Sequence, residues 1–214
     1  MTDERDQVRV LVVCTANICR SPLAERTLQR AFAGSPALAH LTVRSAGTFA
    51  EQDAAMCALS ATLLDRDDDG DWVQAHRSRR LTAELVAASD LVLTMEREQR
   101  SIAARLAPGS QAKIFTITEA AQLAELLADD RATSGDRSIV SLAQGLHGKR
   151  GYAPQPPAPP RRWGRRRVEP VDHLTVPDGH GQSERVHRQA VEATRAAATR
   201  LAAALERAIG ADGA

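Results

Sequence analysis

The chain has 214 residues, of which 43% are hydrophobic and only 3% aromatic, and its formal net charge is +1. This length suits a single α/β domain, residues 1–214, with a core built mostly of Ala, Leu and Val. The balanced charge gives no general reason to expect nucleic acid as a partner, and no apolar run is long enough to cross a membrane.

The stretch Val8–Ala33 predicts a strand, a tight loop and a helix in succession. The apolar run Val8–Val13 is short enough to be one buried strand. Ser21 and Pro22 are typical of a helix start, as the N-cap and the first helical residue. The loop Cys14–Arg20 between them gathers backbone N–H groups and the positive end of the helix dipole, which together favour an anion.

This loop also carries residues suited to phosphoryl transfer. Cys14 is expected at the floor of the loop, where the N–H dipoles, Arg20 and the Ser21 hydroxyl stabilise a nucleophilic thiolate. Arg20 can hold two phosphoryl oxygens in a bidentate fork. Asn17 tolerates left-handed backbone and can brace the loop through its amide. A lone cysteine after an apolar run is more often a buried, inert thiol, but the loop pattern favours catalysis.

The loop sequence CTANICRSP closely resembles the signature Cys-x-Gly-Asn-x-Cys-Arg-Ser-Pro of the low-molecular-weight protein tyrosine phosphatases. The one departure is Ala16, where the family commonly has glycine, and its methyl group restricts the backbone freedom of the loop. The resemblance implies that the loop binds phosphate through Thr15, Ala16, Asn17, Ile18, Cys19, Arg20 and Ser21. It also implies that Cys19 can form a protective disulfide with Cys14, with a merely buried thiol as the alternative.

Leu41–Arg44 predicts a second strand that leads into Ser45-Ala46-Gly47-Thr48, which again looks like the family. In the family, this serine and a later histidine hydrogen-bond the loop asparagine. The resemblance therefore implies a supporting shell of Asn17, Ser45 and His76, although by position alone His76 would be a surface residue in a basic run. Phe49 is a candidate contact for the substrate ring. The neighbouring arginines are expected to be solvated or to form a rim that attracts anions: Arg77, Arg79 and Arg80.

The middle of the chain predicts further alternation of helices and strands. A helix is expected over Asp53–Leu64, followed by a solvated acidic turn, Asp65–Asp71, whose spacing does not match a calcium loop. A short helix starts near Thr82, and buried strands are expected at Asp90–Met95 and Ile114–Ile117.

This order predicts an α/β fold with a four-stranded parallel sheet, helices on both faces and the phosphate-binding loop after the first strand. Ligands of such sheets bind beyond the carboxyl ends of the strands, where the loop that starts at Cys14 lies.

Residues 129–170 look like an insertion relative to the compact family. The segment shows no sustained period and contains PQPPAPP and RRWGRRR. It is expected to be a flexible, solvated loop or spacer. The functional alternative is a lid or a docking segment for an acidic partner, and the arginines could also contact nucleic acid or anionic lipid.

The segment before the last helix, expected over Glu184–Ile209, resembles the family's Val/Ile-Pro-Asp-Pro-Tyr/Phe-Gly loop. Asp178 aligns with the general acid of the family. Gly179 replaces the proline and is expected to make the loop more mobile. His180 replaces the aromatic residue and could still stack on a substrate ring. Asp172 is the second candidate for the acid.

The resemblance implies hydrolysis of protein phosphotyrosine through a cysteinyl-phosphate, with Cys14, Arg20 and Asp178 as catalytic residues. No cofactor is expected, and no metal, because the six histidines show no spacing typical of zinc. The implied partner is a tyrosine-phosphorylated protein, such as a bacterial-type tyrosine kinase, with no nucleic acid and no membrane.

Three cysteines and an N-terminus without a signal peptide favour the cytoplasm. Two alternatives remain. One is a thiol-dependent arsenate reductase of the same fold, for which only Cys57 lies beyond the loop. The other is a module that binds phosphotyrosine without turnover.

Overall fold

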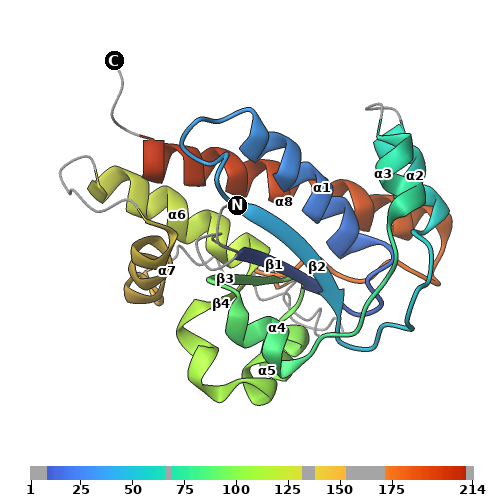
Figure 1. The fold of residues 1–214 in the computed structure, drawn as a ribbon, viewed down its shortest axis with the longest axis horizontal. Coiled ribbons are helices and arrows are strands. Elements are labelled where there is room, and N and C mark those ends of the chain that lie inside the picture. The colour runs from blue at the N-terminus through green and yellow to red at the C-terminus, as the bar shows by residue number, and fades with distance from the viewer. Residues whose placement is uncertain (1–8, 66–68, 132–137, 153–171, 211–214) are drawn as a thin grey trace, which may run out of the picture.

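The computed structural model describes residues 9–65, 69–131, 138–152 and 172–210. Four parallel strands form one sheet in the order β2-β1-β3-β4 (Figure 1). The strands are β1 (Arg9–Cys14), β2 (Thr42–Gly47), β3 (Leu91–Thr94) and β4 (Ile114–Thr116). This arrangement confirms the predicted fold class and places the end of β1 at the centre of the carboxyl edge of the sheet.

Helices connect the strands and cover both faces of the sheet. In chain order they are α1 (Arg20–Ala33), α2 (Ala58–Asp65), α3 (Gly70–Ala75), α4 (Ala83–Ala88), α5 (Arg97–Leu106), α6 (Ile117–Arg131), α7 (Ile139–Gly148) and α8 (Glu184–Gly210), with a 3-10 helix at Pro108–Lys113. Among the described helices, none has the length and apolar character that a membrane span requires.

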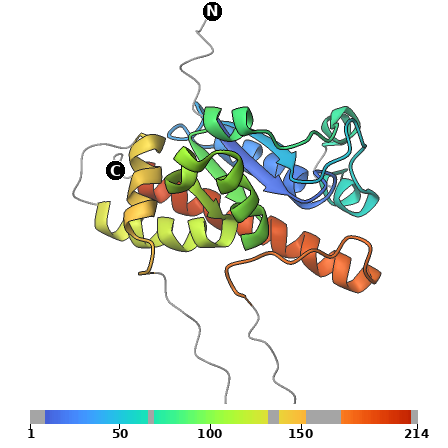
Figure 2. The same cartoon turned by 90° about the horizontal axis from the view of Figure 1, so that it is seen from below.

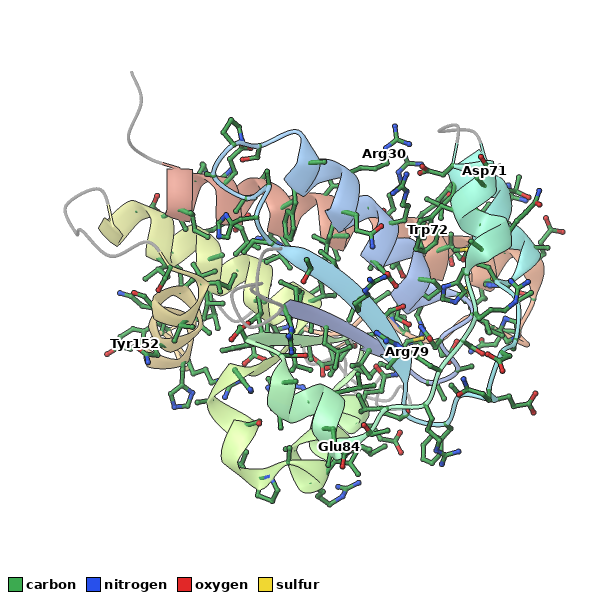
Figure 3. All side chains as sticks on the ribbon, viewed as in Figure 1. Arg30, Asp71, Trp72, Arg79, Glu84 and Tyr152 are labelled. Atoms are coloured by element: carbon green, nitrogen blue, oxygen red, sulfur yellow. The ribbon has the colours of Figure 1, made fainter. Side chains whose placement is uncertain are left out.

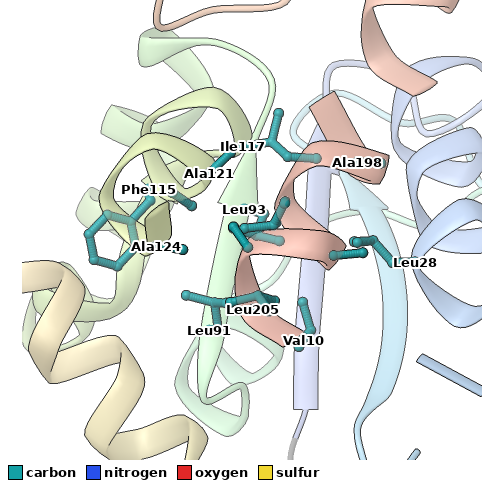
Figure 4. Close-up of a cluster of buried hydrophobic side chains, with 14 of the residues drawn as sticks. Val10, Leu28, Leu91, Leu93, Phe115, Ile117, Ala121, Ala124, Ala198 and Leu205 are labelled. Atoms are coloured by element: carbon teal, nitrogen blue, oxygen red, sulfur yellow. The ribbon is translucent and has the colours of Figure 1, made fainter. Parts of the chain in front are cut away.

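The alternating side chains of β1 divide the core into two parts, because successive strand residues face opposite sides. Val10 and Val12 belong to the larger cluster, which α1, α6, α7 and α8 cover. Figure 4 shows this cluster, with Leu28 of α1 and Leu205 of α8 near Val10. Leu11 and Val13 face the smaller cluster beneath α4 and α5. Burial on both faces explains why β1 is apolar throughout.

The last helix is long enough to connect the sheet with the segments around the loop. The amino-terminal turns of α8 extend past the sheet toward α2, as the two views of the fold show (Figures 1 and 2). The start of α8 at Glu184 is the one expected from the sequence.

Two of the expected helix starts are wrong. Helix α1 begins at Arg20 with Cys19 as its N-cap residue, so Ser21 lies inside the first turn, where its hydroxyl points to the loop. Helix α2 begins at Ala58 rather than at Asp53. Residues 53–57 are not helical because Cys57 donates its backbone N–H to the Ile18 carbonyl at 2.7 Å, and Asp53 has a left-handed φ of 62°.

The acidic segment is not a solvated turn throughout. Asp69 is only 4% exposed and pairs with Arg26 at 2.6 Å and with Arg30 at 3.0 Å. Figure 3 shows Arg30 of α1 facing the side where Trp72 of α3 lies. Two arginines one turn apart on α1 therefore hold the start of α3, and residues 66–68 lie outside the described part of the chain.

The expected loop at 129–170 is partly helical. Helix α7 starts after Ser138, whose hydroxyl accepts the Ser141 backbone N–H at 3.2 Å. Four of its residues are buried in the larger core cluster, and their spacing is that of one helix face: Ile139, Leu142, Ala143 and Leu146. The rest of the expected insertion, residues 132–137 and 153–170 with the Pro-rich and Arg-rich runs, lies outside the described residues.

Candidate active site

The loop that leaves β1 and enters α1 surrounds a buried thiol. Cys14 is 3% exposed, and its Sγ lies 3.0 Å from Ser21 Oγ. The backbone N–H of Asn17 donates to the same sulfur at 3.3 Å. Asn17 has a φ of 55°, in the left-handed region that asparagine tolerates better than most residues. Of the two contacts, the Asn17 N–H directs its positive end at the sulfur.

Arg20 lies at the other end of the loop with its guanidinium almost fully enclosed, at 2% exposure. It donates hydrogen bonds to Thr15 Oγ1 at 3.2 Å, to the Val176 carbonyl at 2.9 Å and to Glu96 at 2.8 Å. It also forms an ion pair with Asp178. These partners come from the loop, from the start of α5 and from the segment before α8, so the guanidinium ties three parts of the chain together.

The predicted supporting residues meet around Asn17. The Asn17 amide donates to Ser45 Oγ at 2.8 Å and to Ser21 Oγ at 3.0 Å. His76 Nε2 lies 2.9 Å from the Asn17 carbonyl, and Nε2 carries the proton because a carbonyl oxygen only accepts. Burial lowers the pKa of His76 from its ordinary value, so the neutral ring is favoured here.

Two further supporting residues were not found from the sequence. Arg79 donates its backbone N–H to Asn17 Oδ1 at 2.9 Å and its Nε to the Ser45 carbonyl at 2.7 Å. Figure 3 shows Arg79 beside the carboxyl ends of β1 and β2, so it is not the solvated side chain that was expected. Arg77 and Arg80 are exposed as predicted. Glu25 accepts a hydrogen bond from Ser45 Oγ at 2.5 Å, and burial raises its pKa.

The last residue of β2, Gly47, lies at a position where only a glycine fits. A Cβ at this position would lie 2.6 Å from the Thr15 carbonyl oxygen and 2.8 Å from the Asn17 nitrogen. Only a residue without a side chain lets β2 come this close to the loop. Ala16, by contrast, is not among the described residues with positive φ, so its backbone does not require the glycine that is common in the family.

Asp178 reaches the loop from the segment that precedes α8. Its carboxylate pairs with Arg20, and its Oδ1 accepts the His180 backbone N–H at 2.9 Å. The segment is anchored because Val176 donates its backbone N–H to the Met95 carbonyl at 2.8 Å. Asp172 forms an ion pair with Arg97 instead, and this hydrogen bond lowers the pKa of Asp172. Of the two candidate acids, only Asp178 contacts Arg20.

Gly179 packs closely on the helix that follows this segment. It is buried against the start of α8, where a Cβ would lie 2.7 Å from both His187 Cα and the Val186 carbonyl oxygen. The absence of a side chain therefore lets the Asp178 segment pack directly on the helix.

The two candidate contacts for a substrate ring lie at the edge of the site. Phe49 is 56% exposed, and the Arg80 guanidinium lies 5.9 Å from the centre of its ring. Its backbone N–H donates to the Thr15 carbonyl at 2.8 Å, so Phe49 stands next to the loop. His180 is exposed, and its ring packs edge-on against the ring of His187, with 5.2 Å between the two ring centres.

The remaining thiols form a group that the sequence spacing did not indicate. Cys19 Sγ lies 3.0 Å from His187 Nε2 and 3.2 Å from Ser60 Oγ, and Cys57 Sγ lies 3.7 Å from the same His187 nitrogen. A hydrogen bond from Cys19 lowers the pKa of Cys57. The same hydrogen bond and burial raise the pKa of Cys19. With His180, these residues make a set of metal-type ligands within 4.8 Å of one another, contrary to the expectation that none is present.

The chain thus combines a parallel sheet whose first strand ends in a cysteine with a tight loop and a buried arginine at the start of the next helix. Residues 9–129, more than half of the chain, match the model of the family described as low molecular weight phosphotyrosine protein phosphatase. The chain belongs to this family.

Its relatives carry the names of protein phosphatases. The low molecular weight protein-tyrosine-phosphatase Etp of Escherichia coli K12 is 36% identical over 104 residues, which cover 49% of this chain and 65% of Etp. The match thus spans less than two thirds of that relative. A protein-arginine-phosphatase of Bacillus subtilis is 34% identical over 110 residues, 51% of this chain and 70% of that protein.

Solved structures show the same fold at lower identity. The structure of Vibrio vulnificus Wzb in complex with benzylphosphonate covers 92% of this chain and 97% of its own, with a TM-score of 0.57 and 23% identity. At this identity the likeness concerns the fold.

Proposed function

We propose that the protein removes phosphate from phosphotyrosine in a protein substrate through a cysteinyl-phosphate. The observation that carries this proposal is the contact of Arg20 with both the Cys14 loop and Asp178. This contact supports the proposal because it joins the loop that begins at Cys14, a guanidinium that can bind an anion and a carboxyl group at the carboxyl edge of the sheet.

In the first step, the Cys14 thiolate attacks phosphorus in line with the ester oxygen. The S–P bond forms and the P–O bond to the phenol breaks, while Arg20 and the loop N–H groups stabilise the equatorial oxygens. Protonated Asp178 gives its proton to the leaving phenolate. In the second step, the Asp178 carboxylate takes a proton from water, the water oxygen attacks phosphorus, and the thiolate leaves with the S–P electrons.

The surroundings of the loop favour a phenyl ring over a guanidinium as the phosphorylated group. Phe49 offers an exposed apolar ring beside the loop, and half-buried Ile18 is a loop residue with an apolar side chain. The Arg80 guanidinium lies over Phe49, where a second guanidinium would be repelled. The relative named as a protein-arginine-phosphatase makes phosphoarginine the substrate to compare.

The test is phosphate release from an aryl phosphate, a phosphotyrosine peptide and a phosphoarginine peptide. The intact chain should turn over the first two, and Cys14→Ser should be inactive. Asp178→Ala should be slowed mainly on substrates with poor leaving groups, whereas the matched variant Asp172→Ala should keep its activity. Phosphotyrosine in a bacterial-type tyrosine kinase is the protein substrate to try next.

Other outcomes would overturn the proposal. Arsenate-dependent consumption of thiol without phosphatase activity would indicate the reductase. Binding of the phosphotyrosine peptide without release of phosphate would indicate a binding module. Faster turnover of the phosphoarginine peptide than of the phosphotyrosine peptide would leave the mechanism unchanged, but it would show that phosphoarginine is the preferred substrate.

A further inference from the structure

Two cysteines and two histidines from four separate segments converge behind the phosphate loop. Cys19 is the N-cap residue of α1, and Cys57 directly precedes α2. His180 follows Asp178 by two residues, and His187 lies in the first turn of α8. Their ligand atoms all lie within 4.8 Å of one another, although the residues span most of the chain.

The distances within this cluster suit a tetrahedral ion. Bonds of about 2.3 Å to sulfur and about 2.0 Å to nitrogen place sulfur and nitrogen ligands about 3.6 Å apart. Cys57 Sγ and His187 Nε2 are 3.7 Å apart, which matches this geometry. Cys19 Sγ and the same nitrogen are 3.0 Å apart, so they would separate by roughly half an ångström on binding.

We propose that Cys19, Cys57, His180 and His187 bind one zinc ion through two thiolates and two imidazoles. Two sulfur and two nitrogen ligands in tetrahedral geometry are typical of zinc, whereas magnesium and calcium prefer oxygen. Both thiols give up their protons to solvent on binding, and the two thiolates neutralise the charge of the ion. A neutral assembly of this kind is compatible with the half-buried position of Cys57 and the full burial of Cys19.

The residues around Cys19 and Cys57 are suited to holding a metal ion. Ser60 Oγ lies 3.2 Å from Cys19 Sγ and 3.4 Å from Cys57 Sγ, where its hydroxyl can stabilise a thiolate. Beside the thiols, apolar side chains form a separate small cluster and limit solvent access on that side: Leu23, Met56, Leu64 and Val191.

Bound zinc would connect the phosphate loop to the acid-bearing segment. Its ligands include the last loop residue before Arg20 and a residue two positions after Asp178. The ion would therefore restrict the motion of Asp178 relative to Cys14, and it would hold Cys19 as a metal thiolate that is not free to form a disulfide with Cys14. This consequence rests on the proposed function, whereas the metal site itself does not.

The experiment uses the full chain in a Cys14→Ser background, kept reduced with a phosphine, so that neither the nucleophile nor turnover contributes. Cobalt is added as a spectroscopic probe, and zinc is then added to displace it. We expect one equivalent of cobalt with thiolate charge-transfer absorption and the d–d bands of a tetrahedral ion. Cys57→Ser and His187→Ala should weaken zinc binding by more than the roughly 10–100-fold that loss of a supporting contact costs.

His40→Ala is the matched control, because His40 is exposed and lies on the loop after α1, and it should bind zinc as the parent does. Metal-free circular dichroism and thermal unfolding of each variant separate loss of a ligand from loss of the fold. Octahedral cobalt without charge transfer, or equal zinc affinity in Cys57→Ser, would overturn the site.

The consequence for Cys19 is tested separately in the chain that retains Cys14. Peroxide treatment followed by peptide mass spectrometry should give less Cys14–Cys19 disulfide in the zinc-loaded chain than in the metal-free chain. An equal yield would show that the ion does not withhold Cys19 from the disulfide. Absence of the tetrahedral cobalt spectrum in the Cys14→Ser chain, together with phosphatase activity in the chain that retains Cys14, would refute the metal site and leave the proposed function standing.

Discussion

Arg20 and Asp178 form an ion pair, so the arginine proposed to bind the phosphoryl group is held by the carboxylate proposed as the acid. The guanidinium is enclosed while the Asp178 side chain is 38% exposed, so the aspartate is the partner that can move away. An incoming phosphate dianion competes with this carboxylate for the same N–H groups. Binding of phosphate should therefore displace the Asp178 carboxylate from Arg20.

Asp178→Asn should bind inorganic phosphate about tenfold more tightly than the intact chain, equal to about 1.4 kcal/mol, because a competing negative charge is removed. Its turnover of aryl phosphates with poor leaving groups should fall. Isothermal titration with phosphate measures the first effect. Asp172→Asn, which alters a carboxylate paired with Arg97, is the control and should leave phosphate affinity unchanged.

Ser45→Ala should lower kcat about fivefold, because it removes the oxygen that accepts the Asn17 amide and loosens the loop by about 1 kcal/mol. The KM for an aryl phosphate and the far-ultraviolet circular dichroism should change little. Ser101→Ala is the matched control, since that exposed hydroxyl on α5 bonds only to its own helix among the contacts described. An unchanged kcat in Ser45→Ala would show that the Ser45 hydroxyl does not support the loop during catalysis.

Gly179→Ala should destabilise the chain by about 1–3 kcal/mol, because the new methyl group would collide with the backbone at the start of α8. Its activity should fall most on poor leaving groups, as the segment that carries Asp178 is displaced. Chemical denaturation and a leaving-group series measure the two effects. The control is Gly109→Ala, where a Cβ meets nothing within 4 Å. If Gly179→Ala behaves like this control, the packing of the segment on α8 is not required.

Asp69→Asn should destabilise the chain by about 2 kcal/mol at pH 7, since it removes a buried carboxylate from two arginines that are themselves partly exposed. Burial acts to raise the pKa of Asp69, but the hydrogen bonds from Arg26 and Arg30 outweigh it and lower the pKa below 3.8. A lowered pKa in the folded state means that the stabilisation is present above the unfolded pKa and is lost as pH falls through the folded value.

The difference between the two chains should therefore be constant from pH 7 to about pH 5 and should shrink below about pH 4. Urea unfolding at pH 7, 5 and 3 measures it. A difference that grew on acidification would show that the ion pairs do not stabilise the fold.

Local patterns were sufficient for most of the fold. The sequence patterns located β1, β3 and β4 to within one residue, because these strands are almost entirely apolar and buried. The expected second strand ended at Arg44, three residues short of the end of β2, whose sequence TVRSAG is not an apolar run. Helix α7 was missed although Ile139, Leu142, Ala143 and Leu146 have helical spacing. The Pro-rich and Arg-rich runs that follow dominate the composition of the segment and concealed that short pattern.

The parts of the site that were missed depend on contacts between distant segments. Arg77, Arg79 and Arg80 lie in one basic run and cannot be distinguished by sequence. Of these three, only Arg79 is partly buried, and its backbone N–H donates to the Asn17 side-chain oxygen. The cluster of Cys19 and Cys57 with His187 has no local spacing to recognise, since its members meet only when α8 packs beside α1 and α2. The requirement for glycine at position 179 could not be predicted either, because it arises from the backbone of α8, which leaves no room for a Cβ there.

The 158 residues that separate Arg20 from Asp178 also set the order in which the site can form during synthesis. At about 5–20 residues per second, roughly 8–30 s pass between the emergence of the phosphate loop and that of its acid. During this interval the nascent chain carries the nucleophile on a sheet whose larger core cluster still lacks α8. With the proposed mechanism, activity therefore requires the last segments of the chain, and a ribosome-bound chain that ends before Asp178 lacks the proposed acid.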